Sequence, residues 1–169
     1  MSAFLDEIEG QVPALRRYAR ALTRNADRAD DLVQDCLERA LRKQSLFRPT
    51  GPLRGWLFTM LLNLYRNSAR HQRRRGDHVP IESLAVEPAT PAPQPGRIAL
   101  NEMSRAIDLL PDDQREALLL VVLEGLTYAE AAQVLKVPAG TLMSRLSRAR
   151  SALKALTGAE QEPRLRTVK

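Results

Sequence analysis

Residues 127–155, TYAEAAQVLKVPAGTLMSRLSRARSALKA, hold the pattern that decides the fold of this chain. Thr127 and Glu130 are spaced as a capping box, in which the threonine oxygen and the glutamate carboxylate each accept a free backbone N–H at a helix start. A short turn is expected at Lys136-Val137-Pro138, with Val137 pointing inward, and a longer helix from Gly140 onward. A helix, a tight turn and a second helix predict a helix-turn-helix.

The second of these helices has an apolar and a polar face. Steps of four, three and four residues predict its buried stripe: Leu142, Leu146, Ala149 and Leu153. Hydroxyl and guanidinium groups share another side: Thr141, Ser144, Arg145 and Arg148. Arginine bonds guanine bidentately in the major groove, and Arg150 and Lys154 beside this face are expected to bind phosphates. A merely solvated face is the alternative, but residues 136–159 hold no acidic side chain, which favours DNA reading.

Two blocks with helical periodicity flank a breaker-rich stretch. Between Gly76 and Gly96 the chain holds five prolines and few large apolar residues, which predicts a flexible, partly extended linker. The expected domains are therefore residues 2–75 and 97–157, joined by a linker at 76–96 and followed by a frayed tail at 158–169. With such a linker, each block is expected to fold alone.

Both blocks are expected to be all-α. In the first block the periodicity predicts three helices, over residues 12–23, 27–43 and 53–73. Pro13 is placed in a first turn with Gly10 as a break before it, and residues 49–52 force a loop. In the second block helices are expected near residues 97–110, 112–124, 128–135 and 138–156. Pro111 and Pro138 mark two of their starts.

The composition of the 169 residues narrows the class of partner. A net charge of +6 and a sequence pI of about 10.1 favour a polyanion, either nucleic acid or an anionic membrane surface, although a merely basic protein has the same balance. Cys36 is the single cysteine, so no intramolecular disulfide forms. No apolar run approaches the roughly 18 residues of a membrane span. The N-terminus lacks the order of a signal peptide, so a cytoplasmic protein is expected.

The helix expected over residues 53–73 changes character halfway along. Its first half is apolar, and core packing is the preferred role of Trp56. Polar positions then recur at steps of four, three and four residues or beside them: Asn63, Arg66, Asn67, Arg70, Arg73 and Arg74. A basic stripe with amide side chains suits single-stranded or distorted nucleic acid. For the arginines at 73–75 alone, a solvated helix end is the alternative.

The helix expected over residues 27–43 carries an acidic, amide-bearing face opposite its apolar stripe: Asp31, Gln34, Asp35 and Glu38. Acidic side chains do not bind the negatively charged phosphates of DNA. This face is therefore expected either to bind a basic protein partner or to be solvated. On the residues alone, water is the more common answer.

Enzymatic activity is not expected, because the sequence lacks the residue patterns that catalysis usually requires. His71 and His78 flank an arginine run, Cys36 lies on an apolar stripe, and neither a glycine-rich phosphate loop nor a metal-ligand cluster appears in the sequence. No catalytic residue, metal or cofactor is therefore assigned. Two rival functions are a stand-alone helix-turn-helix regulator, which needs a dimer surface or ligand pocket, and a membrane-surface protein, which needs a free apolar face beside the basic helix.

Five stretches together resemble the extracytoplasmic-function (ECF) class of bacterial sigma-70 family sigma factors. They are residues 29–40 (ADDLVQDCLERA), 53–63 (LRGWLFTMLLN), 110–118 (LPDDQREAL), 124–132 (EGLTYAEAA) and 140–150 (GTLMSRLSRAR). Their order and spacing are more specific than any one of them. The resemblance implies a dissociable RNA polymerase subunit with sigma regions 2 and 4, which directs promoter recognition, strand opening and initiation for a stress-response regulon.

The resemblance also implies a role for each polar set. The acidic face, Asp31 to Glu38, would bind core RNA polymerase. Asn63 and Asn67 match positions that contact the minus-ten element, to which we also assign Arg66 and Arg70, and the loop at 45–52 matches a segment that holds a flipped base. The minus-thirty-five element would be read by the following set: Thr141, Met143, Ser144, Arg145, Ser147 and Arg148. Met143 stands where the family usually has lysine or arginine. An anti-sigma factor is an expected further partner.

Overall fold

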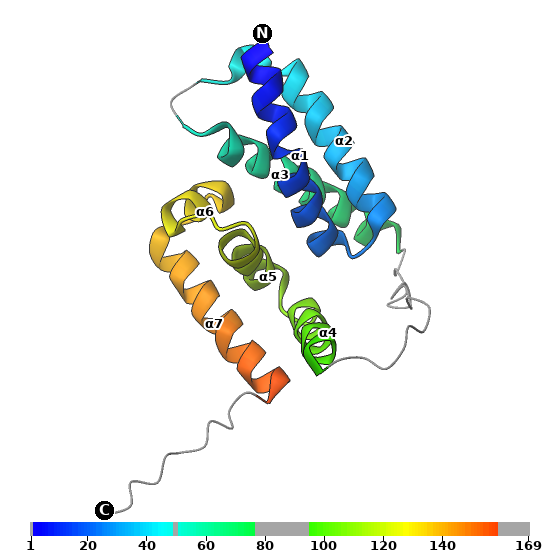
Figure 1. The fold of residues 1–169 in the computed structure, drawn as a ribbon, viewed down its shortest axis with the longest axis vertical. Coiled ribbons are helices and arrows are strands. Elements are labelled where there is room, and N and C mark those ends of the chain that lie inside the picture. The colour runs from blue at the N-terminus through cyan, green and yellow to red at the C-terminus, as the bar shows by residue number, and fades with distance from the viewer. Residues whose placement is uncertain (1, 49–50, 77–94, 159–169) are drawn as a thin grey trace, which may run out of the picture.

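The computed structural model describes residues 2–48, 51–76 and 95–158, and every regular element in these ranges is helical, which confirms the predicted all-α fold (Figure 1). The first block contains three α-helices and a short 3-10 turn: α1 (Ser2–Thr23), α2 (Ala26–Arg42), η1 (Gln44–Leu46) and α3 (Leu53–Arg75). The second contains four α-helices and a π-helical turn: α4 (Pro95–Asp108), α5 (Asp112–Leu118), η2 (Leu119–Leu123), α6 (Tyr128–Leu135) and α7 (Ala139–Thr157).

Helix α1 begins ten residues before its predicted start at position 12 and runs through Gly10 and Pro13. The predicted break at Gly10 is therefore wrong. A glycine inside a helix costs about 1 kcal/mol relative to alanine, whereas burying an isoleucine side chain contributes about 1.5–3 kcal/mol. Ile8 is only 6% exposed and Phe4 packs against the same core, so tertiary packing keeps the first turns helical.

The core of the first block follows the predicted stripes. Helix α2 begins after Asn25, whose side chain accepts the backbone N–H of Arg28, and it buries Cys36 among its apolar residues. Tyr18 of α1 meets Phe58 of α3 edge to face, with ring centroids 5.3 Å apart. Trp56 packs against the core beside Phe47, as predicted from the sequence.

The second block departs most from the sequence prediction in the segment after α5. The helix expected over 112–124 ends at Leu118 and widens into the π-helical turn η2, where the N–H of Glu124 reaches the carbonyl of Leu119 at 3.1 Å. The capping box at the start of α6 is confirmed, since Glu130 and Thr127 exchange bonds of 2.7 and 3.2 Å. Lys136 closes α6 with a φ of 55°, and Leu142 and Leu146 of α7 are buried as predicted.

The two blocks lie against each other and share one continuous apolar core. Helix α3 packs on α6, and α1 packs on η2, while α7 contacts α4, α5 and α6 on the side away from the first block (Figure 1). Of the predicted linker and tail, residues 77–94 and 159–169 lie outside the described residues. Gly76 ends α3 with a φ of 69°, and α4 begins at Pro95, two residues before the predicted start of the second domain. Within the described ranges, none of the helices has the length and apolar character needed to cross a bilayer.

Candidate nucleic-acid interface

The four residues assigned to the minus-ten element do not share one environment. Asn63, Asn67 and Arg70 are exposed on a common face of α3. Arg66 is half-buried and turns toward the second block, where it donates to both carboxylate oxygens of Glu116, at 3.3 and 2.6 Å. The structure therefore brings three of the four together and pairs the fourth with an acidic side chain.

The loop that precedes α3 borders a cavity of about 380 Å³. Positions 49–50 of this predicted base-holding loop lie outside the described residues. Both blocks line the cavity. The first block contributes Phe47, Arg48, Trp56 and Thr59, and the second contributes Leu126, Glu130, Gln133 and Val134. Helix α6 thus covers the cavity beside the loop.

The residues assigned to the minus-thirty-five element lie on α7. Five of the six are exposed: Thr141, Met143, Ser144, Ser147 and Arg148. Arg145 is half-buried, with its Nε atom 3.6 Å from a carboxylate oxygen of Asp113 in α5. Arg150 and Lys154 are also exposed, and Arg150 donates to the hydroxyl of Tyr128 at 3.2 Å. The exposed set lies away from the buried leucines of α7 and is open to a ligand.

The acidic face of α2 is exposed along its whole length: Asp31, Gln34, Asp35 and Glu38. Gln34 donates to Glu38 at 3.3 Å, and Arg42 lies 3.7 Å from the same carboxylate. Both contacts are between exposed side chains, so they leave this face open to a partner.

Sequence reasoning missed the polar contacts between the blocks. Glu124, whose side chain is 0% exposed, accepts two hydrogen bonds from Arg17, at 2.9 and 2.7 Å. Arg54 lies 3.4 Å from the same carboxylate and also donates to the backbone carbonyl of Glu124. Hydrogen bonding to Glu124 raises the pKa of Arg17, and hydrogen bonding to Glu116 raises the pKa of Arg66. Hydrogen bonds between an arginine and a carboxylate of this kind are strong and directional.

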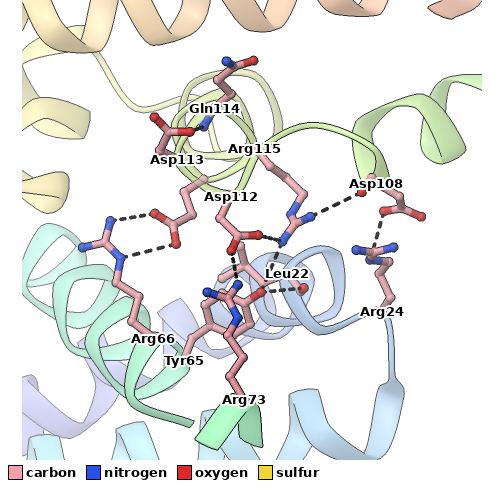
Figure 2. Close-up of polar contacts among 11 residues, drawn as sticks. Leu22, Arg24, Tyr65, Arg66, Arg73, Asp108, Asp112, Asp113, Gln114 and Arg115 are labelled. Carbon is pink, nitrogen blue, oxygen red and sulfur yellow. Dashed lines mark hydrogen bonds and ion pairs between the residues drawn. The ribbon is translucent and has the colours of Figure 1, made fainter. Parts of the chain in front are cut away.

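A second group of contacts joins α3 to α5 (Figure 2). Asp112 accepts from Arg73 at 2.7 Å and from Arg115 at 2.8 Å, and Arg115 also donates to the hydroxyl of Tyr65 at 3.3 Å. Arg73 had been predicted as part of the basic stripe, so a second member of that stripe also pairs with the second block.

Asp108 and Arg24 form a further pair beside this group, 3.4 Å apart (Figure 2). Burial raises the pKa of Asp108, and Arg24 opposes that rise. Since Arg24 belongs to the first block and Asp108 to the second, this pair also links the blocks.

One signal for these contacts was present in the sequence. Glu124 follows an apolar run, residues 117–123, and a carboxylate inside an apolar environment requires a cationic or hydrogen-bonding partner. The apolar run therefore predicts that Glu124 forms a buried ion pair. The run does not identify the partner, because Arg17 lies 107 positions earlier in the chain.

Two family models match the chain. The model described as the Sigma2 domain of PhyR matches residues 8–62, and the model described as Sigma-70, region 4 matches residues 100–153. The first match includes α2 and the apolar half of α3, and the second includes the helix-turn-helix.

Among curated proteins, the chain is similar to the ECF RNA polymerase sigma factor EcfG of Rhodopseudomonas palustris (strain TIE-1). The two are 44% identical over 154 residues, which cover 89% of this chain and 83% of that protein. Among solved structures, it is similar to the sigma factor RpoE in complex with the anti-sigma factor NepR from Bartonella quintana, with a TM-score of 0.78, 36% identity and coverage of 95% of this chain and 100% of that one. It is also similar to CnrH in complex with the cytosolic domain of CnrY, with a TM-score of 0.70, 27% identity and coverage of 94% and 90%.

Proposed function

Because this chain belongs to the ECF sigma factors of the sigma-70 family, which direct transcription initiation, we propose that its two blocks divide that work as sigma regions 2 and 4. Region 2 extends over residues 2–75 and region 4 over 97–157, with the linker at 76–96. The rival interpretation as a stand-alone helix-turn-helix regulator is not favoured, since both blocks match sigma domains in the sigma order.

One observation supports this division most strongly: two exposed polar faces occur on helices of different blocks. Asn63 and Asn67 lie four residues apart on α3, so both side chains can meet the same DNA strand. Thr141, Ser144 and Arg148 lie on α7, the second helix of the helix-turn-helix, whose dimensions suit a major groove. A chain with two separate DNA-facing helices suits the two separate elements of a bacterial promoter.

The acidic face of α2 is the proposed site for core RNA polymerase. Asp31, Asp35 and Glu38 are exposed there, and their charge opposes any role on DNA. A basic polymerase surface would complement it electrostatically and would speed association as well as orient the subunit. This proposal replaces the interpretation that the residues alone favoured, in which the acidic face of α2 is simply solvated.

An anti-sigma factor is the proposed regulator of this chain. One similar solved structure is the sigma factor RpoE in complex with the anti-sigma factor NepR, and another is CnrH in complex with the cytosolic domain of CnrY. We infer that this chain is held by an anti-sigma factor, as RpoE is by NepR, until a stress signal releases it. We also propose that it acts in the cytoplasm, where RNA polymerase and promoters are, as a binding subunit without catalysis of its own.

In vitro transcription with core polymerase on a genomic promoter library tests the proposal and supplies a cognate promoter. The minus-ten assignment is then tested by Asn63→Ala with Asn67→Ala, which should impair strand opening in the holoenzyme more than duplex binding. Permanganate reactivity of the opened thymines measures this step. Ser68→Ala, an exposed change one residue along α3, is the control. Normal thymine reactivity in the double variant would remove Asn63 and Asn67 from the site.

A further inference from the structure

Three polar residues stand one above another on a single side of α7. Thr141, Arg145 and Arg148 lie four and three residues apart, so each is about one helical turn from the next. Thr141 and Arg148 are exposed, whereas the side chain of Arg145 is only 21% exposed. The middle residue of this row therefore has a different environment from the two residues that flank it.

The group that holds Arg145 belongs to α5, which packs against α7. Helix α7 contains no carboxylate, so its acidic partner comes from another element. The Oδ1 atom of Asp113 accepts the backbone N–H of Gln114 at 2.9 Å (Figure 2), and the Oδ2 atom lies 3.6 Å from the Nε atom of Arg145. The start of α5 thus fixes a carboxylate that faces the guanidinium group of Arg145.

This carboxylate opposes base reading by Arg145. The ion pair itself is weak, because 3.6 Å is longer than an N–H···O hydrogen bond and half of the Asp113 side chain is in water. Asp113 nevertheless neutralises the positive charge of Arg145. Its oxygens are also hydrogen-bond acceptors, like O6 and N7 of guanine, so a guanine edge that approaches Arg145 is repelled by the carboxylate beside it.

We propose that Asp113 determines the sequence preference of this chain by withholding Arg145 from the major groove, so that the exposed residues of α7 read the minus-thirty-five element. The inference rests on the proposed minus-thirty-five role of α7. Asp113 is a positioning residue, since it acts on DNA only through Arg145. Without the carboxylate, Arg145 lies in line with Thr141 and Arg148 and can bond a further guanine bidentately.

Asp113→Asn tests this role, because it removes the charge and keeps an oxygen that can accept the N–H of Gln114. Holoenzyme with this variant, bound to promoters randomised in the minus-thirty-five element, should show a new guanine preference at one position, of roughly 5-fold or more. The new preference should vanish when Arg145→Ala is added. Asp113→Glu keeps the charge and should retain the wild-type preference. An unchanged preference at every position in Asp113→Asn would overturn the proposal.

Two comparisons separate the release of Arg145 from a general loss of negative charge. Glu102→Gln removes an exposed carboxylate of α4 and should leave the preference unchanged. If Asp113→Asn tightens binding evenly across all sequences, or still does so with Arg145→Ala, the carboxylate only repels phosphates and has no role in base preference. Arg145→Ala alone should preserve the wild-type preference, because Arg145 is already withheld. A preference lost in that variant would show that Arg145 reads a base despite Asp113, which is the opposite of the proposal.

The same assay distinguishes failure of this inference from failure of the proposed function. If Arg148→Ala and Ser144→Ala both leave binding unchanged, α7 is not the reader, and the role of Asp113 falls with it. If they alter binding while Asp113→Asn does not, only the role of Asp113 is removed. Should circular dichroism show that Asp113→Asn is unfolded, Asp113→Ser, whose hydroxyl can also accept the N–H of Gln114, must produce the same new guanine preference.

Discussion

Arg17 donates two hydrogen bonds to the buried carboxylate of Glu124, at 2.9 and 2.7 Å, although the two residues lie 107 positions apart in the chain. Its neighbour Arg16 makes only a 3.8 Å ion pair with Asp30, in which both side chains are about half exposed. Two adjacent arginines on α1 thus have very different surroundings, one at the contact between the blocks and one at the surface.

Arg17→Ala should therefore destabilise the chain more than Arg16→Ala. A hydrogen bond to a charged group contributes about 1.5–3 kcal/mol, and the lower end applies here because half of Arg17 is in water. An exposed pair such as Arg16–Asp30 contributes about 0–1 kcal/mol. Urea unfolding followed by circular dichroism gives both free energies of unfolding. Equal losses would show that the contact with Glu124 adds nothing to stability.

Binding to core polymerase should depend on the acidic face of α2. Asp35→Arg with Glu38→Arg reverses two exposed charges and should weaken the complex while the helix content stays unchanged, because neither side chain is buried. Glu7→Arg with Glu9→Arg makes the same charge change on exposed positions of α1 and is the matched control. Titration of labelled protein with core enzyme measures the affinity. Equal affinity of the two double variants would assign this face to water.

The capping box should make the stability of α6 depend on pH. The backbone N–H of Thr127 lowers the pKa of Glu130 from its ordinary value of 4.5. A carboxylate whose pKa is lower in the folded state stabilises the fold above its unfolded pKa, and that contribution is lost as the pH falls through the folded pKa. Glu130→Gln should then unfold more easily than wild type at pH 7, and the difference should shrink below pH 4.5.

Thr127→Ala serves as the comparison, because the threonine hydroxyl caps the helix in either protonation state of Glu130. Its loss should cost about 1 kcal/mol at both pH values. Urea titrations across the acid range measure the two variants in parallel. A deficit of Glu130→Gln that is the same at pH 7 and in acid would refute the role of its charge.

Cys36 should be inert in the native protein. Burial raises the pKa of its thiol to about 12, although Arg39 opposes the shift, and its Sγ atom donates to the carbonyl of Leu57 at 3.6 Å. Since the thiolate is the reactive form, a disulfide reagent at pH 8 should label the protein only after denaturant is added. Rapid labelling of the native chain would mean that α2 opens readily from α3.

The sequence predicted those elements of the fold that depend on residues close together in the chain. The spacing of Thr127 and Glu130 is enough to predict the capping box. The helical spacing of Leu142 and Leu146 is enough to predict that both are buried on one face. Gly10 was misjudged because its propensity to break a helix is weaker than the packing of Ile8 beside it. The π-helical turn before Glu124 contacts α1 of the first block, and periodicity within one segment does not encode such a contact.

The candidate site was also predicted only in part, because spacing along one helix predicts which residues share a face but not which residues of the other block contact them. Asn63 and Asn67 lie one turn apart, and the structure exposes both. Arg66 was assigned to the same element, but it points about 100° away from Asn67 around the helix and has a different neighbour. That neighbour, Glu116, is 50 positions further along, and only the approach of the two blocks identifies it.

Arg148 is expected to read a base of the minus-thirty-five element. It is exposed on α7 beside Ser144, away from the buried Leu142 and Leu146, so its removal leaves the core of region 4 intact. A bidentate bond to guanine means that Arg148→Ala should cost about 1–3 kcal/mol at one base and relax the preference there. The assay is binding of holoenzyme, at two salt concentrations, to promoters randomised in this element.

The matched control for Arg148 is Arg150, which is also exposed but turned toward region 4 itself, where it donates to the hydroxyl of Tyr128 at 3.2 Å. As a phosphate contact, Arg150→Ala should weaken binding to all sequences alike and lower the salt slope by about one. The two variants therefore differ in kind, one changing sequence preference and the other only affinity and its salt dependence. If Arg148→Ala behaves like Arg150→Ala, Arg148 binds the backbone, and base reading passes to Arg145, which must then leave Asp113 to reach the groove.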